Sequence, residues 1–170
     1  YAVFGGFPSI WNLIDKKLSF EENIIKQVCN PNNMLHHIGF WTVESQLRET
    51  SVYNTILSAL AQGKCKLNDL YQHTGFSRAK ISVYLKNLME RDITEKMFSF
   101  ETGANRDVQK GLYRIREPFL RFLYCFVYPN CSSIAMGEGD RVYREKIQPY
   151  LTEFVKEAFE ELYPFLRSSI

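Results

Sequence analysis

The sequence lacks the patterns that mark a zinc protein, a disulfide-bonded secreted domain or a membrane protein. None of its four cysteines lies in a CxxC or CxxH spacing, which predicts reduced, buried thiols and no metal site. The most apolar stretch, residues 119–127, contains Arg121 and ends before Pro129, far short of the roughly 20 residues of a membrane span. No signal peptide opens the chain, so we expect a cytoplasmic protein without membrane contact.

A strong excess of one charge is also absent. The formal net charge is +2, which is too small to identify a nucleic-acid partner by itself. The charge is uneven, however, because residues 51–117 carry eleven Lys and Arg against seven Asp and Glu. This segment is therefore +4, the flanks together are −2, and the segment is the candidate for a nucleic-acid contact.

The chain contains enough apolar residues to fold. With 170 residues and 45% hydrophobic content, it can bury a sizeable core. Helical spacing of apolar residues dominates, and two short stretches change to a period near two. We predict a mostly α protein with a small β-hairpin, in three parts: a helical bundle over residues 1–50, a winged helix-turn-helix over residues 51–116 and a C-terminal helical segment over residues 117–170.

Three helices are expected in the central part. The first ends at Gly63, where a left-handed residue closes a helix, and the second ends at Gly75, whose tight turn lets the third helix cross it steeply. Ser77 offers a hydroxyl to the free amides at the start of the third helix. The buried faces are predicted to hold Val52, Ile56, Leu57, Leu60, Leu67, Leu70, Tyr71, Ile81, Leu85 and Leu88.

The segment after the third helix is predicted to be the wing. Residues 93–98 and 112–115 would form its strands, and the polar residues 101–110 would join them as a hairpin loop. In the DNA-binding form of this fold, the third helix enters the major groove while the wing contacts phosphate or the minor groove. The residues predicted to contact DNA are Arg78, Lys80, Ser82, Lys86 and Asn87 on the helix, and Lys96, Arg106 and Lys110 on the wing.

The predicted DNA-binding face is only mildly basic. Val83 and Glu90 also point outward from the third helix, and a carboxylate there repels phosphate. We therefore expect weak binding to duplex DNA with little sequence choice and a strong dependence on salt, since each neutralised phosphate releases counterions.

The N-terminal part carries its own helix signals. Pro8 is well placed as the first residue of a helix, and Ser19-x-x-Glu22 is a capping box that starts a second one. A third helix is expected from residue 34 to about residue 48. These helices would form a small bundle that packs against the winged helix.

The C-terminal part begins with Glu117-Pro118, again a proline at a helix start. This helix is expected to end near Pro129, and residues 131–140 to form a loop that contains Gly137 and Gly139. A last helix is expected over residues 141–166, broken near Pro149. The loop has no phosphate-binding pattern.

The order of several motifs resembles that of a known family. The motifs are GGFP at residues 5–8, SFEENI at 19–24, VESQL through LNDL at 43–70, LYRIREPFLRF at 112–122 with PN at 129–130, and EAFEEL at 157–162. Together they resemble the archaeal-type P-loop ATPases, which are AAA+/STAND-like proteins also frequent in bacteria. In that family an ATPase core is followed by a helical lid, a winged helix and a nuclease-like domain of unknown role.

The resemblance implies that the catalytic core lies outside this chain. The P-loop and the acidic metal-binding strand would precede Tyr1, in a parent protein that binds ATP and Mg²⁺, so we expect no phosphoryl transfer and no cofactor here. The start at Tyr1 agrees with a piece of a longer protein. By the same resemblance, Gly6 and Pro8 would lie near the adenine in the parent; the alternative is a plain helix-entry turn.

Three functions are compatible with the sequence. The first is weak DNA binding by the winged helix of a prokaryotic ATPase. The second is a coupling module that links the lid to the C-terminal domain, to a partner protein or to another copy, through aromatic residues such as Trp11, Trp41 and Tyr84. The third is a free-standing winged-helix transcription regulator.

Overall fold

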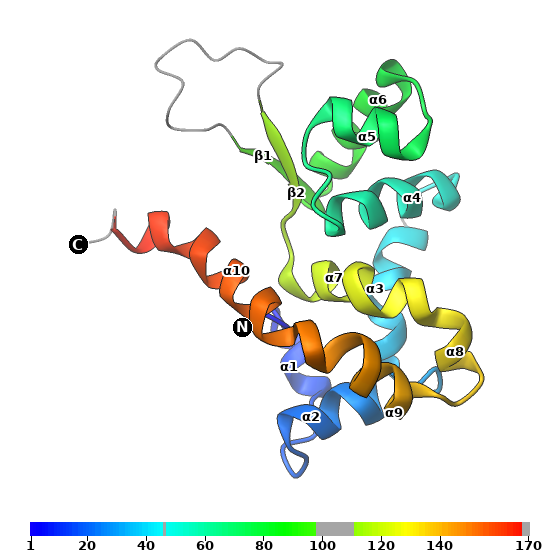
Figure 1. Cartoon of the computed structure of the whole chain (residues 1–170), viewed down its shortest axis with the longest axis vertical. Coiled ribbons are helices and arrows are strands. Elements are labelled where there is room, and N and C mark those ends of the chain that lie inside the picture. The colour runs from blue at the N-terminus through cyan, green and yellow to red at the C-terminus, as the bar shows by residue number, and fades with distance from the viewer. Residues whose placement is uncertain (46, 98–110, 168–170) are drawn as a thin grey trace.

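The computed structural model describes residues 1–45, 47–97 and 111–167, with side chains described as far as residue 159. This part of the chain is mostly helical and contains a two-stranded antiparallel sheet (Figure 1). The predicted fold class, mostly α with a small β-hairpin, is confirmed.

The winged helix is built in the predicted order. It comprises α4 (Thr50–Ala61), α5 (Leu67–Thr74), α6 (Arg78–Met89), β1 (Thr94–Met97) and β2 (Leu112–Ile115). The two strands pair antiparallel with Thr94 opposite Ile115 and Met97 opposite Leu112. The predicted hairpin loop, residues 101–110, lies outside the described residues.

The helix boundaries of this unit follow from their caps. Gly63 has φ +80° and Gly75 has φ +72°, a left-handed conformation that costs glycine least. After Gly63, the amide of Lys64 donates to the carbonyl of Ala59 over 3.0 Å, which closes the end of α4. At the start of α6, the Ser77 hydroxyl accepts from the amide of Lys80. All three predicted caps are confirmed.

The core of the winged helix contains nearly all the predicted apolar residues. Ile56, Leu57, Leu70, Ile81 and Leu88 are each fully buried. Tyr71 was predicted to be buried and is 40% exposed. It follows the inward-facing Leu70 by one residue, and adjacent helical side chains point about 100° apart, so its ring lies on the outer surface of α5.

The rest of the molecule, called here the helical half, consists of helices from both ends of the chain. The N-terminal ones are α1 (Pro8–Leu13), α2 (Phe20–Asn23), η1 (Ile24–Val28) and α3 (Met34–Glu44). The C-terminal ones are α7 (Pro118–Phe122), η3 (Leu123–Val127), η4 (Tyr128–Asn130), α8 (Cys131–Ala135), α9 (Gly139–Val142), η5 (Tyr143–Ile147) and α10 (Gln148–Arg167). The predicted starts at Pro8, at the Ser19–Glu22 capping box and at Pro118 are confirmed.

Two predictions for the helical half differ from the structure. The helix from Met34 ends at Glu44, before the predicted residue 48. Residues 131–140 are not a loop, because α8 and α9 occupy most of them. Gly139 does not serve a turn there: a Cβ atom on it would lie 2.1 Å from the carbonyl oxygen of Cys29, so glycine permits α9 to pack on the end of η1.

The predicted break near Pro149 is a wide turn instead. Residues 143–147 form the π-helical turn η5, and the amide of Gln148 bonds to the carbonyl of Tyr143. The same kind of turn, η3, precedes Pro129, and the amide of Tyr128 bonds to the carbonyl of Leu123. A proline ring collides with the carbonyl four residues earlier in a regular α-helix, and a π turn just before it relieves that collision without ending the helix.

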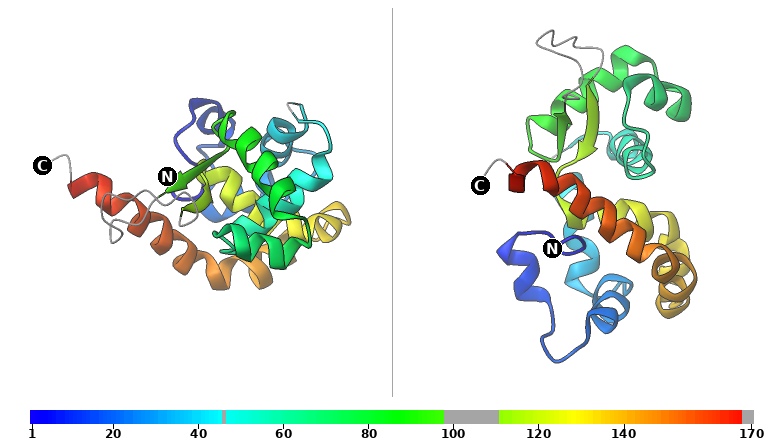
Figure 2. Two further views of the ribbon diagram at one scale, coloured as in Figure 1. Left: turned by 90° about the horizontal axis from the view of Figure 1, so that it is seen from above. Right: turned by 60° about the vertical axis from the view of Figure 1, so that its left-hand side comes forward.

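The helical half has a core made from two distant segments. Phe4, Ile24 and Leu35 from the N-terminal segment pack with Phe122 and Phe154 from the C-terminal one. Figure 2 shows the result, with the N-terminal helices and α10 on one side of the molecule and the winged helix on the other.

The helix formed by α7 and η3 contributes to both cores. Phe119 and Leu123 belong to the core of the helical half, whereas Leu120 and Tyr124 belong to the core of the winged helix. The Tyr124 hydroxyl donates to Oδ1 of Asn54 on α4 over 2.6 Å. This helix therefore joins the two halves through side chains on its opposite faces.

Candidate nucleic-acid interface

The outer face of α6 is the surface that a winged helix would present to DNA. Ile81, Leu85 and Leu88 face the core and are buried. Ser82 and Lys86 lie on the opposite side and are exposed, as predicted. The apolar spacing of α6 thus leaves one long side of this helix open to solvent.

The first turn of α6 carries two exposed cations, each held over an aromatic ring. The Arg78 guanidinium lies 4.3 Å from the centre of the Tyr71 ring and donates to Oδ1 of Asn68 over 2.6 Å. The Lys80 ammonium lies 4.8 Å from the centre of the Phe76 ring. Cation–π contacts of this kind fix the position of a charge on the surface without neutralising it.

Tyr71 and Asn68 were not among the predicted site residues. The exposed Tyr71 of α5 stacks on the first charged residue of α6 across the turn. A sequence signal existed, since Tyr71 lies four residues before Gly75 and Arg78 three residues after it, so both flank the tight turn. The apolar spacing of α5 led instead to the prediction that Tyr71 is buried.

Two other predicted contacts on α6 are partly occupied within the protein. The amide nitrogen of Asn87 donates to the hydroxyl of Tyr53 over 2.9 Å, and Asn87 is half-buried rather than fully outward as predicted. Lys86 forms an exposed ion pair of 3.8 Å with Glu90. The C-terminal half of α6 is therefore less cationic than its first turn.

The wing presents a mixed charge at its base. Lys96 is half-buried on β1, with its ammonium 5.3 Å from the centre of the Tyr113 ring. Arg114 on β2 bonds to Glu95 over 2.5 Å, and Arg116 pairs with Asp92. The other predicted wing contacts, Arg106 and Lys110, lie outside the described residues.

The GGFP turn lies at the junction of the two halves. Gly6 and Phe7 line a cavity of about 340 Å³ together with Arg116 and Glu117, whereas Pro8 begins α1 and is not in its wall. The indole nitrogen of Trp11 donates to the carbonyl of Gly5 over 3.0 Å and holds the turn against α1.

Glu117 is a functional candidate that the sequence reasoning missed. Its carboxylate caps α7 by accepting from the amide of Leu120 over 2.6 Å, and its other oxygen is buried against Gly5 with no hydrogen-bond partner among the described residues. Burial raises the pKa of Glu117 to about 6, although the amides of Leu120 and Phe119 oppose the shift. The Glu-Pro pair marked a helix start and gave no sign of this burial.

Metal-binding clusters and membrane-spanning helices are absent from the described residues. The described residues contain no group of three or more His, Cys, Asp or Glu side chains placed to hold a metal ion, and the four cysteines form no disulfide. His36 and His37 bond separately to the carbonyls of Val28 and Pro31. None of the described helices combines the length and apolar character needed to cross a bilayer.

Comparison with known proteins adds two similarities. A helix-turn-helix model described as bacterial regulatory protein, arsR family, matches residues 54–96, which run from α4 into β1. An uncharacterized protein of Methanocaldococcus jannaschii is 26% identical over 162 residues, which make up 95% of this chain and 35% of that protein. The chain thus spans about a third of the length of that relative. No solved structure matches the chain significantly. The family match agrees with the geometry, and residues 54–96 are a helix-turn-helix that runs into the first strand of the wing.

Proposed function

We propose that this protein binds duplex DNA through the exposed face of α6 and the wing, weakly and with little sequence choice. The observation that carries the proposal is the arsR-family match at residues 54–96 on a unit whose α6 leaves its outer side free. Arg78 and Lys80 stand in the first turn of that helix, from which a recognition helix contacts bases and phosphates.

The weakness and low specificity follow from the charge of the surface. Glu90 lies beside Lys86, and Val83 is 57% exposed on the same helix, where a sequence-reading protein would carry donors or acceptors for base edges. Contacts between Lys or Arg side chains and DNA phosphates supply most of the non-specific affinity for DNA. The surface therefore favours backbone contacts over base readout.

The test is a binding measurement over a range of salt concentrations. Anisotropy of labelled duplexes of unrelated sequence should show similar affinities that fall steeply with salt. The plot of log affinity against log salt has a negative slope. In the triple variant Arg78→Ala, Lys80→Ala, Lys86→Ala this slope should become less steep by about 3, since each lost phosphate contact contributes about 0.9. All three side chains are exposed, so the fold should be kept.

A matched control removes the same amount of charge elsewhere. Lys16, Lys17 and Arg144 are exposed on the helical half, and their triple alanine variant should keep both affinity and slope. Wild-type affinity in the α6 variant, or an equal loss in the control, would refute binding through α6.

A second candidate function is mechanical coupling between the two halves. It is favoured by the helix α7–η3, which places Leu123 in one core and Tyr124 in the other. A movement imposed on the helical half would then shift the winged helix through this shared element. A partner protein or a second copy docked on either half is compatible with this role, and sedimentation would detect self-association.

We further propose that the chain is the non-catalytic part of a prokaryotic, cytoplasmic ATPase. The motif order described above supports this, with an ATPase core in cis that binds ATP and Mg²⁺ and with Gly6 near the nucleotide at the junction cavity. A free-standing regulator fits the arsR-family match equally well. A GxxxxGK[ST] motif encoded upstream of Tyr1 would decide for the ATPase, and its absence from the full-length protein would decide for the regulator.

A further inference from the structure

A cavity of about 410 Å³ lies between α3, α4 and the turn of η4 into α8, on the side of the molecule where the two halves meet. Its wall is formed by four residues of α3, by Asn54 of α4, and by Tyr128 and Cys131. The residues from α3 are His37, Phe40, Trp41 and Glu44. Neither the predicted DNA surface nor the GGFP turn contributes to it.

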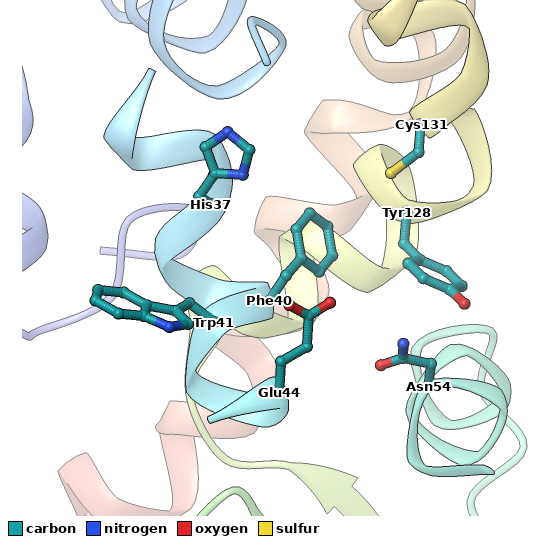
Figure 3. A pocket seen from close by; sticks show the side chains of 7 residues that line it. All are labelled: His37, Phe40, Trp41, Glu44, Asn54, Tyr128 and Cys131. Atoms are coloured by element: carbon teal, nitrogen blue, oxygen red, sulfur yellow. The ribbon is translucent and has the colours of Figure 1, made fainter. Parts of the chain in front are cut away.

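Figure 3 shows Phe40, Glu44, Asn54, Tyr128 and Cys131 around a common space. The Phe40 and Tyr128 rings pack against each other on one side of this space, with the Glu44 carboxylate beside Phe40 and the Asn54 amide opposite. Trp41 lies along the outer side of α3 and is 62% exposed, so it forms the rim. The cavity thus has one aromatic wall formed by both rings, one carboxylate and one amide.

The aromatic wall is fixed by a third ring packed behind it. The ring centres of Phe40 and Tyr128 are 6.0 Å apart, and the fully buried Tyr124 lies 5.9 Å from Phe40 and 5.3 Å from Tyr128. The Tyr124 hydroxyl donates to Oδ1 of Asn54, which leaves the Asn54 NH₂ group as the donor available to the cavity. The geometry is therefore preorganised by the packing of both halves.

The cavity is electrostatically suited to a cation. Glu44 carries the one formal charge among the lining residues, and it contributes, after burial and Tyr128, to the raised pKa of the neighbouring Tyr124. Burial also raises the pKa of Cys131, so this thiol stays neutral. Aromatic faces add a negative quadrupole potential of the kind that attracts ammonium groups.

We propose that this cavity binds a small organic cation that carries a quaternary ammonium group. The cation would lie against Phe40 and Tyr128 with Glu44 as its counter-ion, and the Asn54 amide would donate to an oxygen of the ligand. A primary ammonium needs several acceptors for its three N–H groups, which this largely aromatic wall does not supply. A quaternary ammonium makes no such demand.

The ligand would bridge the halves of the molecule. Phe40 and Glu44 belong to α3 of the helical half, and Asn54 to α4, the first helix of the winged helix. Binding at this cavity is independent of whether α6 binds DNA, because the two sites share no residue.

The test uses choline as the probe and isothermal titration calorimetry of the whole protein. Choline should bind at one site with a dissociation constant in the millimolar range or tighter. The neutral isostere 3,3-dimethyl-1-butanol should bind at least tenfold more weakly, and so should ethanolamine. Equal binding of the neutral isostere would overturn the role of charge, and equal binding of ethanolamine would overturn the preference for a quaternary group.

Variants locate the site. Glu44 is exposed, so Glu44→Gln should fold normally and weaken choline binding about fivefold or more. The matched control Glu21→Gln, at an exposed acid on α2, should leave binding unchanged. In a Trp11→Phe background Trp41 is the remaining tryptophan, and its fluorescence should change on titration with choline. No heat and no fluorescence change with choline, or full binding by Glu44→Gln, would refute the proposal.

Discussion

The two halves of this molecule are built from contacts of different range. The winged helix takes nearly all of its core from residues 43–115, a continuous stretch joined by Leu120 and Tyr124. The helical half instead brings residues 3–35 against residues 119–154. The first kind of core forms from neighbouring elements, whereas the second requires closure of a long loop, which costs chain entropy. Two helices contribute to both cores: α7–η3, and α3, whose Leu35 lies in the core of the helical half and whose Val43 lies in that of the winged helix.

The largest expected effect would show whether the halves unfold together. Phe122 in the helical half is fully buried, and Leu85 in the winged helix is nearly so. Phe122→Ala should lower the free energy of unfolding by about 3–5 kcal/mol and Leu85→Ala by about 2–5 kcal/mol. Because α7–η3 contributes to both cores, each variant should shift a single transition in chemical denaturation followed by circular dichroism.

The expectation of a single transition fails if the two halves unfold independently. In that case, the denaturation curve of Leu85→Ala would show two transitions, and the transition of the helical half would stay at its wild-type denaturant concentration. A control at an exposed apolar position, Val83→Ala, should change the free energy of unfolding by about 0.5 kcal/mol or less.

A second, smaller effect concerns Glu117 at the junction. Its pKa is about 6 in the folded protein against a usual value of 4.5. Below pH 4.5 the carboxyl is protonated in both states and carries no penalty. As the pH rises through 4.5 and then through 6, the unfolded state ionises first, so stability should fall by about 2 kcal/mol between pH values well below 4.5 and well above 6, at 1.36 kcal/mol per pKa unit.

Replacement of this carboxyl separates its contribution from other titrations. Glu117→Gln should abolish the loss of stability over that pH interval in urea denaturation, because the amide does not ionise. Glu153→Gln, at an exposed acid of α10, should keep the pH dependence of the native protein. An unchanged slope in Glu117→Gln would mean that the carboxyl is not buried in solution.

The smallest effect tests one bond between the halves. Tyr124→Phe removes the hydroxyl that donates to Asn54, and a hydrogen bond of this kind contributes about 0.5–1.5 kcal/mol. The variant should lose about 1 kcal/mol of stability in thermal unfolding, while Tyr150→Phe, at an exposed tyrosine, should lose none. Equal stability of the two variants would show that this bond does not help to hold the halves together.

Much of the winged helix could be predicted from the sequence because its signals are local. The glycines at 63 and 75 and the hydroxyl of Ser77 each act within a few residues, and the apolar period of α6 fixes which side is buried. The helical half was harder. No local rule states that Gly139 packs against Cys29, or that a turn before Pro149 widens instead of breaking.

The candidate sites divide in the same way. Exposure of Arg78, Lys80 and Lys86 followed from helical spacing alone. The stacking of Arg78 on Tyr71, the burial of Glu117 against Gly5 and the bond from Asn87 to Tyr53 depend on tertiary contacts. The cavity between α3 and α4 collects residues from three separate segments, so no motif in the sequence could have marked it.

The π turns have a consequence for the history of this chain. A turn of this type is an α-helical turn with one additional residue, and η1, η3 and η5 all belong to the helical half. Removal of a single residue from such a turn restores an ordinary α-helical turn and leaves the residues after it on the same faces, because the extra residue is taken up within the turn. Homologues that differ by one-residue gaps at these three places can therefore share this architecture, and an alignment that forbids gaps inside helices would pair the wrong faces.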